Sequence, residues 1–403
     1  MGLRFARRDF LRFISAGSLS ALGGWGELTA TRRGEAMNRN LLDAIEASDV
    51  ARASDQLAKN IKEGIDPWEI HLSLFPVVQC VLNPPFINPH LPKMYRVCRE
   101  LVPYLSQSRI AALVFLEVRE YARRPKLEKI RRGKSLTSPV TFKDVETAIK
   151  ENDPGKVSVL MATFLKQKGG VEFARRLLLL GSGYLNNSLG HSVSCTAFIL
   201  LEMLERTDQD SWPALSALAS YFCKGRFHTT PVPEVHGPPP TKERLALNLL
   251  RATSGGGIVN LHHTITRYAI ERSRKFLTPE DYSHMANAWI LFLGDKKEER
   301  VTLKGSMAGV VEDYDRFYEM FLDLKAGPVA ASLQGMINSG EGRHKLGRFV
   351  IKSLCDKYQG NYDPHYVTGL GSTLWLLDHY WKDTPIATNA LYQYVDFLFN
   401  GLS

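Results

Sequence analysis

Residues 189–206 read L-G-H-S-V-S-C-T-A-F-I-L-L-E-M-L-E-R and predict a single apolar α-helix. Four residues of this stretch recur at spacings of four, three and four: His191, Cys195, Phe198 and Glu202. Because eleven residues of an α-helix return to within about 20° of the starting direction, these side chains share one face. The predicted helix therefore carries an imidazole at its start and a carboxylate three turns later.

Helical spacing of apolar residues continues through most of the 403-residue chain, whereas strand-like alternation is nearly absent. The sequence A-I-E-A-S-D at residues 44–49 returns as A-I-K-E-N-D at residues 148–153, and His191 follows His90 by a similar interval. An interval that nearly repeats indicates an internal duplication. We therefore expect an all-α fold whose helical hairpins repeat and pack as an α-solenoid, or as a closed α-toroid, around a central cavity.

Loops rich in glycine, proline or asparagine lead to a histidine at four places where an apolar helix is predicted to begin. These histidines are His90, His191, His262 and His365. Favoured helix caps stand two positions before three of them: Asn88, Asn260 and Asp363. Because the helix dipole disfavours a positive charge in the first turn, these imidazoles are expected to be neutral.

Neutral imidazoles that converge could hold a metal. Three or more of them with a carboxylate suit iron, copper or zinc, so the candidate ligands are His90, His191, His262, His365 and Glu202. No H-x-x-x-H, E-x-x-H or C-x-x-C motif places two ligands on one helix. General acid–base catalysis by His191, His262 and His365 is therefore an equal alternative, and hydrogen-bonded core histidines are a third. His71 and His263 are additional candidates.

The N-terminus predicts export. The sequence A-R-R-D-F-L-R at residues 6–12 is similar to a twin-arginine (Tat) motif, and a short apolar run and a small-residue exit near residues 28–30 follow it. We expect residues 1–30 to be a signal peptide read by the Tat translocase, which places the mature protein in the periplasm or outside the cell. Tat substrates cross the membrane folded, so a cofactor could be loaded before export.

One strong break divides the remaining chain. Residues 225–241 read G-R-F-H-T-T-P-V-P-E-V-H-G-P-P-P-T, which is too rich in proline for a helix. We expect an N-terminal helical half at residues 31–224, a linker at residues 225–241 and a C-terminal helical half at residues 242–403. The two halves are expected to form one compact domain.

Composition limits the partners. The net charge is +9, and residues 123–134 hold seven bases, one acid and no aromatic residue, which favours a solvated loop over nucleic-acid binding. No apolar run reaches the roughly eighteen residues of a membrane-spanning helix, so no integral membrane segment is expected after signal cleavage. Five cysteines lie far apart, which favours buried thiols over a disulfide framework.

Three segments together resemble the questin oxidase-like family. They are residues 190–206 followed by L-S-A-L-A-S-Y-F at 215–222, L-H-H-T-I-T-R-Y-A-I at 261–270, and D-P-H-Y-V-T-G-L-G-S at 363–372. The resemblance implies an all-α oxidoreductase, which in the fungal members is an oxygenase acting on anthraquinone-type polyketides with NADPH. Export would separate the chain from cytosolic NADPH, so that cofactor rests on the resemblance alone.

The sequence thus predicts an exported, oxygenase-like oxidoreductase. Its substrate would be a small organic molecule, apolar or aromatic, bound in a cavity lined by His191, His262 and His365, with iron or copper as the candidate cofactor. The alternative is a non-catalytic helical-repeat protein whose histidines are structural and whose surface binds a partner.

Overall fold

A computed structural model describes residues 32–128, 131–206, 209–225, 235, 237–301, 329–330, 350, 363–380 and 382–402. Within these ranges the chain forms helices and no strand, which confirms the all-α prediction. The predicted signal peptide at residues 1–30 lies outside the described residues, as does most of the proline-rich segment 225–241. None of the described helices combines the length and the apolar character that crossing a membrane requires.

The helices follow one another with short connections. The N-terminal part contains α2 (Arg32–Glu46), α3 (Val50–Lys62), α4 (Pro67–Ser73), α5 (Phe75–Val78), α6 (His90–Leu101), the 3-10 turn η1 (Val102–Tyr104) and α7 (Gln107–Arg123). The middle part contains α8 (Phe142–Lys150), α9 (Pro154–Lys168), α10 (Gly170–Ser182), α11 (His191–Glu205) and α12 (Trp212–Gly225). The C-terminal part contains α13 (Lys242–Thr253), α14 (Gly257–Ser273), η3 (Arg274–Phe276), α15 (Pro279–Phe292), α19 (His365–Tyr380) and α20 (Thr384–Leu402).

The repeated hexapeptide folds in the same way twice. Ser48 and Asn152 both adopt the left-handed conformation, with φ of 58° and 57°, and each ends the first helix of a hairpin. The carboxylates of Asp49 and Asp153 then cap the following helices, α3 and α9, by accepting a backbone N–H three residues further on. The local part of the predicted duplication is therefore present in the structure.

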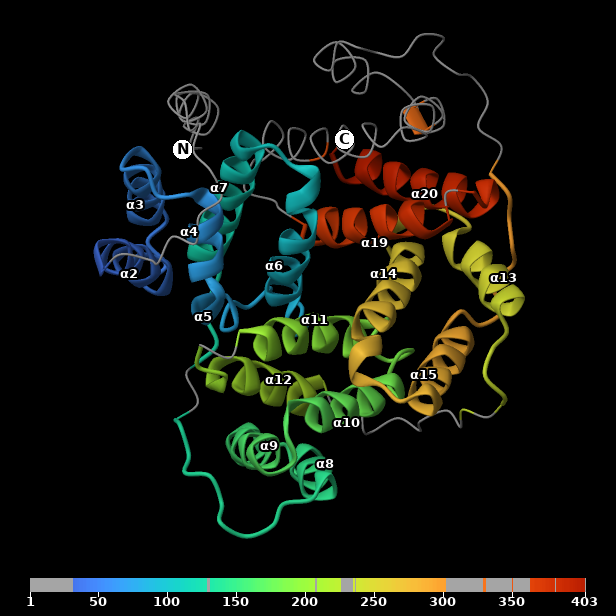
Figure 1. The fold of residues 1–403 in the computed structure, drawn as a ribbon, viewed down its shortest axis with the longest axis horizontal. Helices are drawn as coiled ribbons and strands as arrows, with labels where there is room; N and C mark the ends of the chain where they lie inside the picture. The colour runs from blue at the N-terminus through green and yellow to red at the C-terminus, as the bar shows by residue number, and fades with distance from the viewer. Residues whose placement is uncertain are drawn as a thin grey trace.

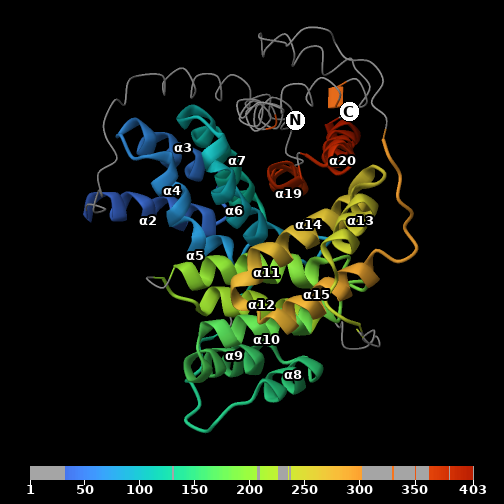
Figure 2. The ribbon, with the colours of Figure 1, turned by 45° about the vertical axis from the view of Figure 1, so that its right-hand side comes forward.

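Four helices pack in a closed cycle at the centre of the described fold. Helix α6 contacts α11, α11 contacts α14, α14 contacts α19, and α19 contacts α6. Figure 1 shows them as the four sides of a frame, with α7, α12, α15 and α20 among the helices outside it. Figure 2 shows the hairpin α8–α9 projecting from one end. Each predicted histidine helix is one side of this frame.

Helix α11 is buried nearly all round. Every residue from His191 to Met203 is buried, as expected for a helix that is apolar on all faces. Gly190, which precedes it, has φ of 76°, and a Cβ there would lie 2.0 Å from the Thr266 hydroxyl on α14. Only glycine fits this position without strain, so Gly190 allows the start of α11 to approach α14 closely.

Candidate metal centre

The four predicted histidines lie together inside the frame. Successive ring centroids are 4.5 Å apart for His90 and His191, 4.6 Å for His191 and His262, 4.6 Å for His262 and His365, and 4.8 Å for His365 and His90. Nε2 of His191 is 2.7 Å from Nε2 of His90 and 3.1 Å from Nε2 of His262. All four residues are buried. The structure therefore joins residues separated by up to 275 positions into one cluster.

Three of the four histidines begin a helix, as predicted. His90, His191 and His365 are the first residues of α6, α11 and α19. The prediction for His262 was wrong, because α14 begins at Gly257 and His262 lies in its second turn. The carboxylate of Asp396 accepts the Gly257 backbone N–H at 3.1 Å, so a residue distant in sequence supports the earlier start.

The predicted caps are only partly present. Asp363 Oδ1 accepts the backbone N–H of His365 at 2.9 Å, as expected of a cap. Asn260 instead lies inside α14, where its amide donates to the Gly256 carbonyl. Pro89, not Asn88, occupies the capping position of α6 and offers no side-chain bond.

Three of the imidazoles have a defined tautomer. The Nδ1 atom of each lies close to an oxygen that can only accept: the Ser188 carbonyl for His191 at 2.7 Å, the Ile258 carbonyl for His262 at 2.7 Å, and the Asp363 carboxylate for His365 at 2.6 Å. Nδ1 must therefore carry the proton, and Nε2 presents a lone pair to the cluster. An Nδ1–H that donates to a carbonyl or carboxylate is the usual outer shell of a metal-bound histidine.

His90 has the opposite tautomer. Its Nδ1 lies 3.1 Å from Nδ2 of Asn83, whose Oδ1 accepts a hydrogen bond from the Arg124 guanidinium. Arg124 thereby orients the amide so that Nδ2 donates to Nδ1 of His90. The proton of neutral His90 then lies on Nε2, which donates to Nε2 of His191.

The arrangement leaves lone pairs without a donor. Nε2 of His262 faces Nε2 of His191 at 3.1 Å, neither nitrogen carries a proton in the tautomers defined above, and the lone pair of His191 already accepts from His90, so that of His262 has no donor. Nε2 of His365 is buried and has no hydrogen-bond partner. One nitrogen each of His90, His191 and His365 lie within 4.8 Å of one another. A cation among these nitrogens would turn the repulsion between lone pairs into coordination.

The electrostatic environment keeps the imidazoles neutral. Burial holds the pKa values of His90, His191 and His262 well below the ordinary value, and neighbouring imidazoles and Lys93 lower them further. Burial also lowers the pKa of His365, although Asp363 opposes that shift. Neutral imidazole is the form that binds a metal.

Sequence reasoning missed Lys93, which stands one turn after His90 on α6. Its side chain is fully buried, and Nζ has no hydrogen-bond partner. Lys93 lies close enough to lower the pKa values of all four histidines. The available signal was the i,i+3 spacing from His90 within an apolar helix, which places both residues on one face.

Glu202 lies away from the four histidines, so its prediction as a ligand or orienting residue was wrong. Eleven residues of helix separate it from His191, which corresponds to about 16 Å along the axis. Its carboxylate accepts from Arg96 at 3.1 Å and from Arg99 at 2.6 Å. His191 and Glu202 are eleven residues apart on α11, and residues that share one face of a helix can still lie at its opposite ends.

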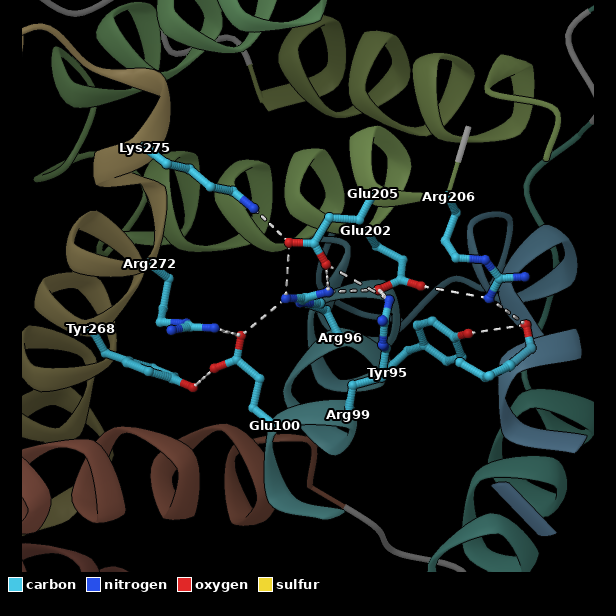
Figure 3. Close-up of polar contacts among 11 residues, drawn as sticks. Tyr95, Arg96, Arg99, Glu100, Glu202, Glu205, Arg206, Tyr268, Arg272 and Lys275 are labelled. Atoms are coloured by element: carbon cyan, nitrogen blue, oxygen red, sulfur yellow. Dashed lines mark hydrogen bonds and ion pairs between the residues drawn. The ribbon is translucent and has the colours of Figure 1, made fainter. Parts of the chain in front are cut away.

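The charged network around Glu202 joins three sides of the frame. Figure 3 shows residues of α6, α11, α14 and the adjoining segments: Tyr95, Arg96, Arg99, Glu100, Glu202, Glu205, Arg206, Tyr268, Arg272 and Lys275. Arg96 of α6 pairs with Glu202 and Glu205 of α11, and Glu100 of α6 pairs with Arg272 of α14. The network therefore ties α6, α11 and α14 together well away from the starts of α6 and α11.

The additional histidines lie outside the cluster. His71 Nδ1 is 2.8 Å from Glu117 Oε2, and the imidazole stacks between Trp68 and Tyr95. His263 packs its ring edge against Phe292. These interactions do not involve the four central imidazoles.

A cavity of about 850 Å³ lies elsewhere in the fold, against α8, α9 and α10. Phe142, Phe164, Leu179 and Tyr184 line it, together with charged residues at its edge, and none of the four central histidines does. The expectation of a large cavity lined by His191, His262 and His365 is therefore not met by this cavity.

The four described cysteines form no disulfide with one another. Cys98, Cys195 and Cys223 are buried and Cys80 is partly buried, in agreement with the prediction of buried thiols. Burial raises the pKa of Cys195 and of Cys223 to about 11, so both are protonated at neutral pH without a metal. Cys355 lies outside the described residues.

The metal-free protein is expected to lose stability as the pH falls below about 6.5, the ordinary value for histidine. Burial lowers the folded-state pKa of all four histidines, so the unfolded chain binds more protons below that pH. The free energy of unfolding should fall by up to about 1.4 kcal/mol per pH unit for each histidine. Urea unfolding of chelator-treated protein between pH 7.5 and 5 measures this slope.

The matched variant is His191→Gln, which removes one titrating ring but keeps an amide of similar polarity. Its slope should be smaller by up to about 1.4 kcal/mol per pH unit. An unchanged slope would mean that His191 binds its proton equally well in the folded state.

Comparison with known proteins adds no family: no family model, curated protein or solved structure matches this chain.

Proposed function

We propose that this protein is a metal-dependent oxidoreductase whose His90, His191, His262 and His365 surround one transition-metal ion. The observation that carries the proposal is the convergence of four buried imidazoles in which the Nε2 lone pairs of His262 and His365 have no hydrogen-bond donor. Neutral nitrogen donors suit iron, copper and zinc. Iron and copper can change oxidation state, which an oxidoreductase requires.

The residues divide into ligands and an outer shell. His191, His262 and His365 each present an unprotonated Nε2, which in His191 accepts from His90, while Ser188, Ile258 and Asp363 hold the opposite nitrogen. His90 presents Nε2–H in its neutral form and is the hydrogen-bond donor of the set. A bound iron or copper would supply one-electron chemistry and activation of oxygen, and the chain would supply position and exclusion of water.

The proposal also includes the substrate, the reaction, the toroidal arrangement and the export that the sequence predicts. The substrate would be an apolar or aromatic organic molecule, and the reaction would be an oxygenation of the kind that the questin oxidase-like resemblance implies. The helical units would continue around the frame as a closed α-toroid. Export by the Tat translocase to the periplasm or beyond would follow loading of the metal.

Metal analysis of protein produced in its own host tests the proposal. Protein recovered from the exported fraction is expected to contain about one iron or copper ion per chain, measured by inductively coupled plasma mass spectrometry. Electron paramagnetic resonance should then show nitrogen coordination. A well-folded protein that lacks stoichiometric metal would contradict the metal centre, and recovery from the cytoplasm alone would contradict export.

The cavity of about 850 Å³ supports a second candidate function, that of a ligand-binding protein with structural histidines. Its lining combines apolar side chains with the charged residues Lys143, Lys168 and Arg176 at the edge. In this case an apolar ligand would bind equally well before and after chelator treatment. Dependence of ligand binding on metal content separates the two functions.

A further inference from the structure

Lys93 is a buried cationic side chain beside the four imidazoles, and its Nζ has no hydrogen-bond partner among the described residues. An ammonium has three protons to donate and nothing to accept with. Burial of an unpaired charge is strongly unfavourable unless a partner of opposite charge is supplied. A molecule that binds at this place and carries negative charge would supply that partner.

The charge balance of the centre points the same way. Burial lowers the pKa of Lys93, and the groups that oppose this shift are Cys195, whose thiol is buried and protonated, and the carboxylate of Asp363. The carboxylate of Asp363 is already engaged by Nδ1 of His365. A divalent cation and a charged Lys93 together carry more positive charge than the single carboxylate of Asp363 can neutralise.

His90 provides a second donor on the same helix. Its Nε2–H points to the shared centre because Asn83, held by Arg124, donates to the opposite nitrogen. Lys93 follows His90 by three residues on α6, so the two side chains lie next to each other on one face. One face of α6 thus presents a cationic donor and a neutral donor side by side, while the other three helices present acceptors.

We propose that the centre binds a carboxylate, or an anion of the same form, with one end at the metal and the other at Lys93 and the His90 Nε2–H. This inference rests on the proposed metal centre and names the class of its exogenous ligand. An anion with two terminal acceptors can place one at the metal and let the other accept from both side chains. The organic substrate would then carry a carboxylate.

Azide is a suitable probe, since it is a small anion with two terminal acceptors and gives a charge-transfer absorption band when it binds Cu(II). Protein stripped with a chelator and reloaded with Cu(II) is titrated with azide, and acetate is added in competition. Lys93→Met should keep the copper but weaken azide binding about 10- to 100-fold, the contribution of one charge-assisted hydrogen bond. Lys156→Met, which removes an exposed lysine of α9 that pairs with Glu151, should leave azide binding unchanged.

A second variant tests His90 separately. Asn83→Asp places an acceptor at Nδ1 of His90, which moves the proton to Nδ1 and turns Nε2 from a donor into an acceptor. Copper should be retained, since four lone pairs then face it, while azide binding should weaken about tenfold through loss of one hydrogen bond.

The outcomes separate this inference from the function on which it rests. If the wild-type protein binds no copper, the metal analysis shows it before azide is added, and both fall together. If copper binds and Lys93→Met binds azide and acetate as tightly as the wild type, the carboxylate site is wrong and the metal centre stands. If Lys93→Met loses the copper, Lys93 is a metal ligand and the proposed anion site is also wrong.

Discussion

Replacing His191 with alanine is expected to reduce the metal content of the purified protein from about one ion per chain to near zero. His191 is the central member of the cluster, because its Nε2 lies within 3.1 Å of nitrogens from two other histidines. Loss of an outer-shell partner alone weakens metal binding roughly 10- to 100-fold, and loss of a ligand should exceed that. Metal content and competition with a chromophoric chelator measure the change.

The matched control is His379→Ala on α19, which removes an exposed histidine whose Nδ1 donates to the Trp375 carbonyl. Its metal content should equal that of the wild type. Circular dichroism should show both variants to be helical. If His191→Ala keeps a full complement of metal, the ion binds elsewhere and the four histidines are structural.

Replacing Glu202 with alanine is expected to lower the free energy of unfolding by about 3–5 kcal/mol, the cost of breaking a buried ion pair from one side. The Glu202 side chain is 1% exposed and accepts from both Arg96 and Arg99. Arg96 itself is nearly buried, so the variant leaves part of its charge without compensation. Urea denaturation at pH 7 measures the loss.

Glu146→Ala is the control, because Glu146 forms a surface ion pair with Lys143 that is worth at most about 1 kcal/mol. Folded Glu202→Ala should still hold its metal, since the carboxylate is remote from the histidines. A variant that is stable but metal-free would restore Glu202 as a member of the centre. Equal stabilities of the Glu202→Ala and wild-type proteins would mean that Glu205 and Glu100 suffice for Arg96.

The charged network around Glu202 holds three of the histidine-bearing helices in one arrangement. Helices α6, α11 and α14 each carry a central histidine near one end and a member of the network near the other, as Figure 3 shows for the network side. Their mutual angles decide how far apart the nitrogens lie. Because buried ion pairs have demanding geometry, the network favours one arrangement of the three helices.

Several features were predictable from the sequence because they depend on neighbours along the chain. The turn after residues 44–47 and its repeat after 148–151 need only a left-handed residue and a capping aspartate, and the two are neighbours in the sequence at each place. The helical periodicity and the starts of α6, α11 and α19 are of the same kind. The four histidines were found because each follows a helix-breaking loop.

Tertiary structure alone decided what those histidines face. The start of α14 is supported by Asp396, which is 139 residues away from Gly257. Glu202 pairs with arginines that precede it by more than a hundred residues. The tautomer of His90 depends on Arg124 acting through Asn83, and the isolation of Lys93 depends on burial by other helices. Helical periodicity specifies the direction of a side chain around its own axis. Packing between helices sets which groups a side chain contacts and at what distance, and a local sequence pattern does not specify that packing.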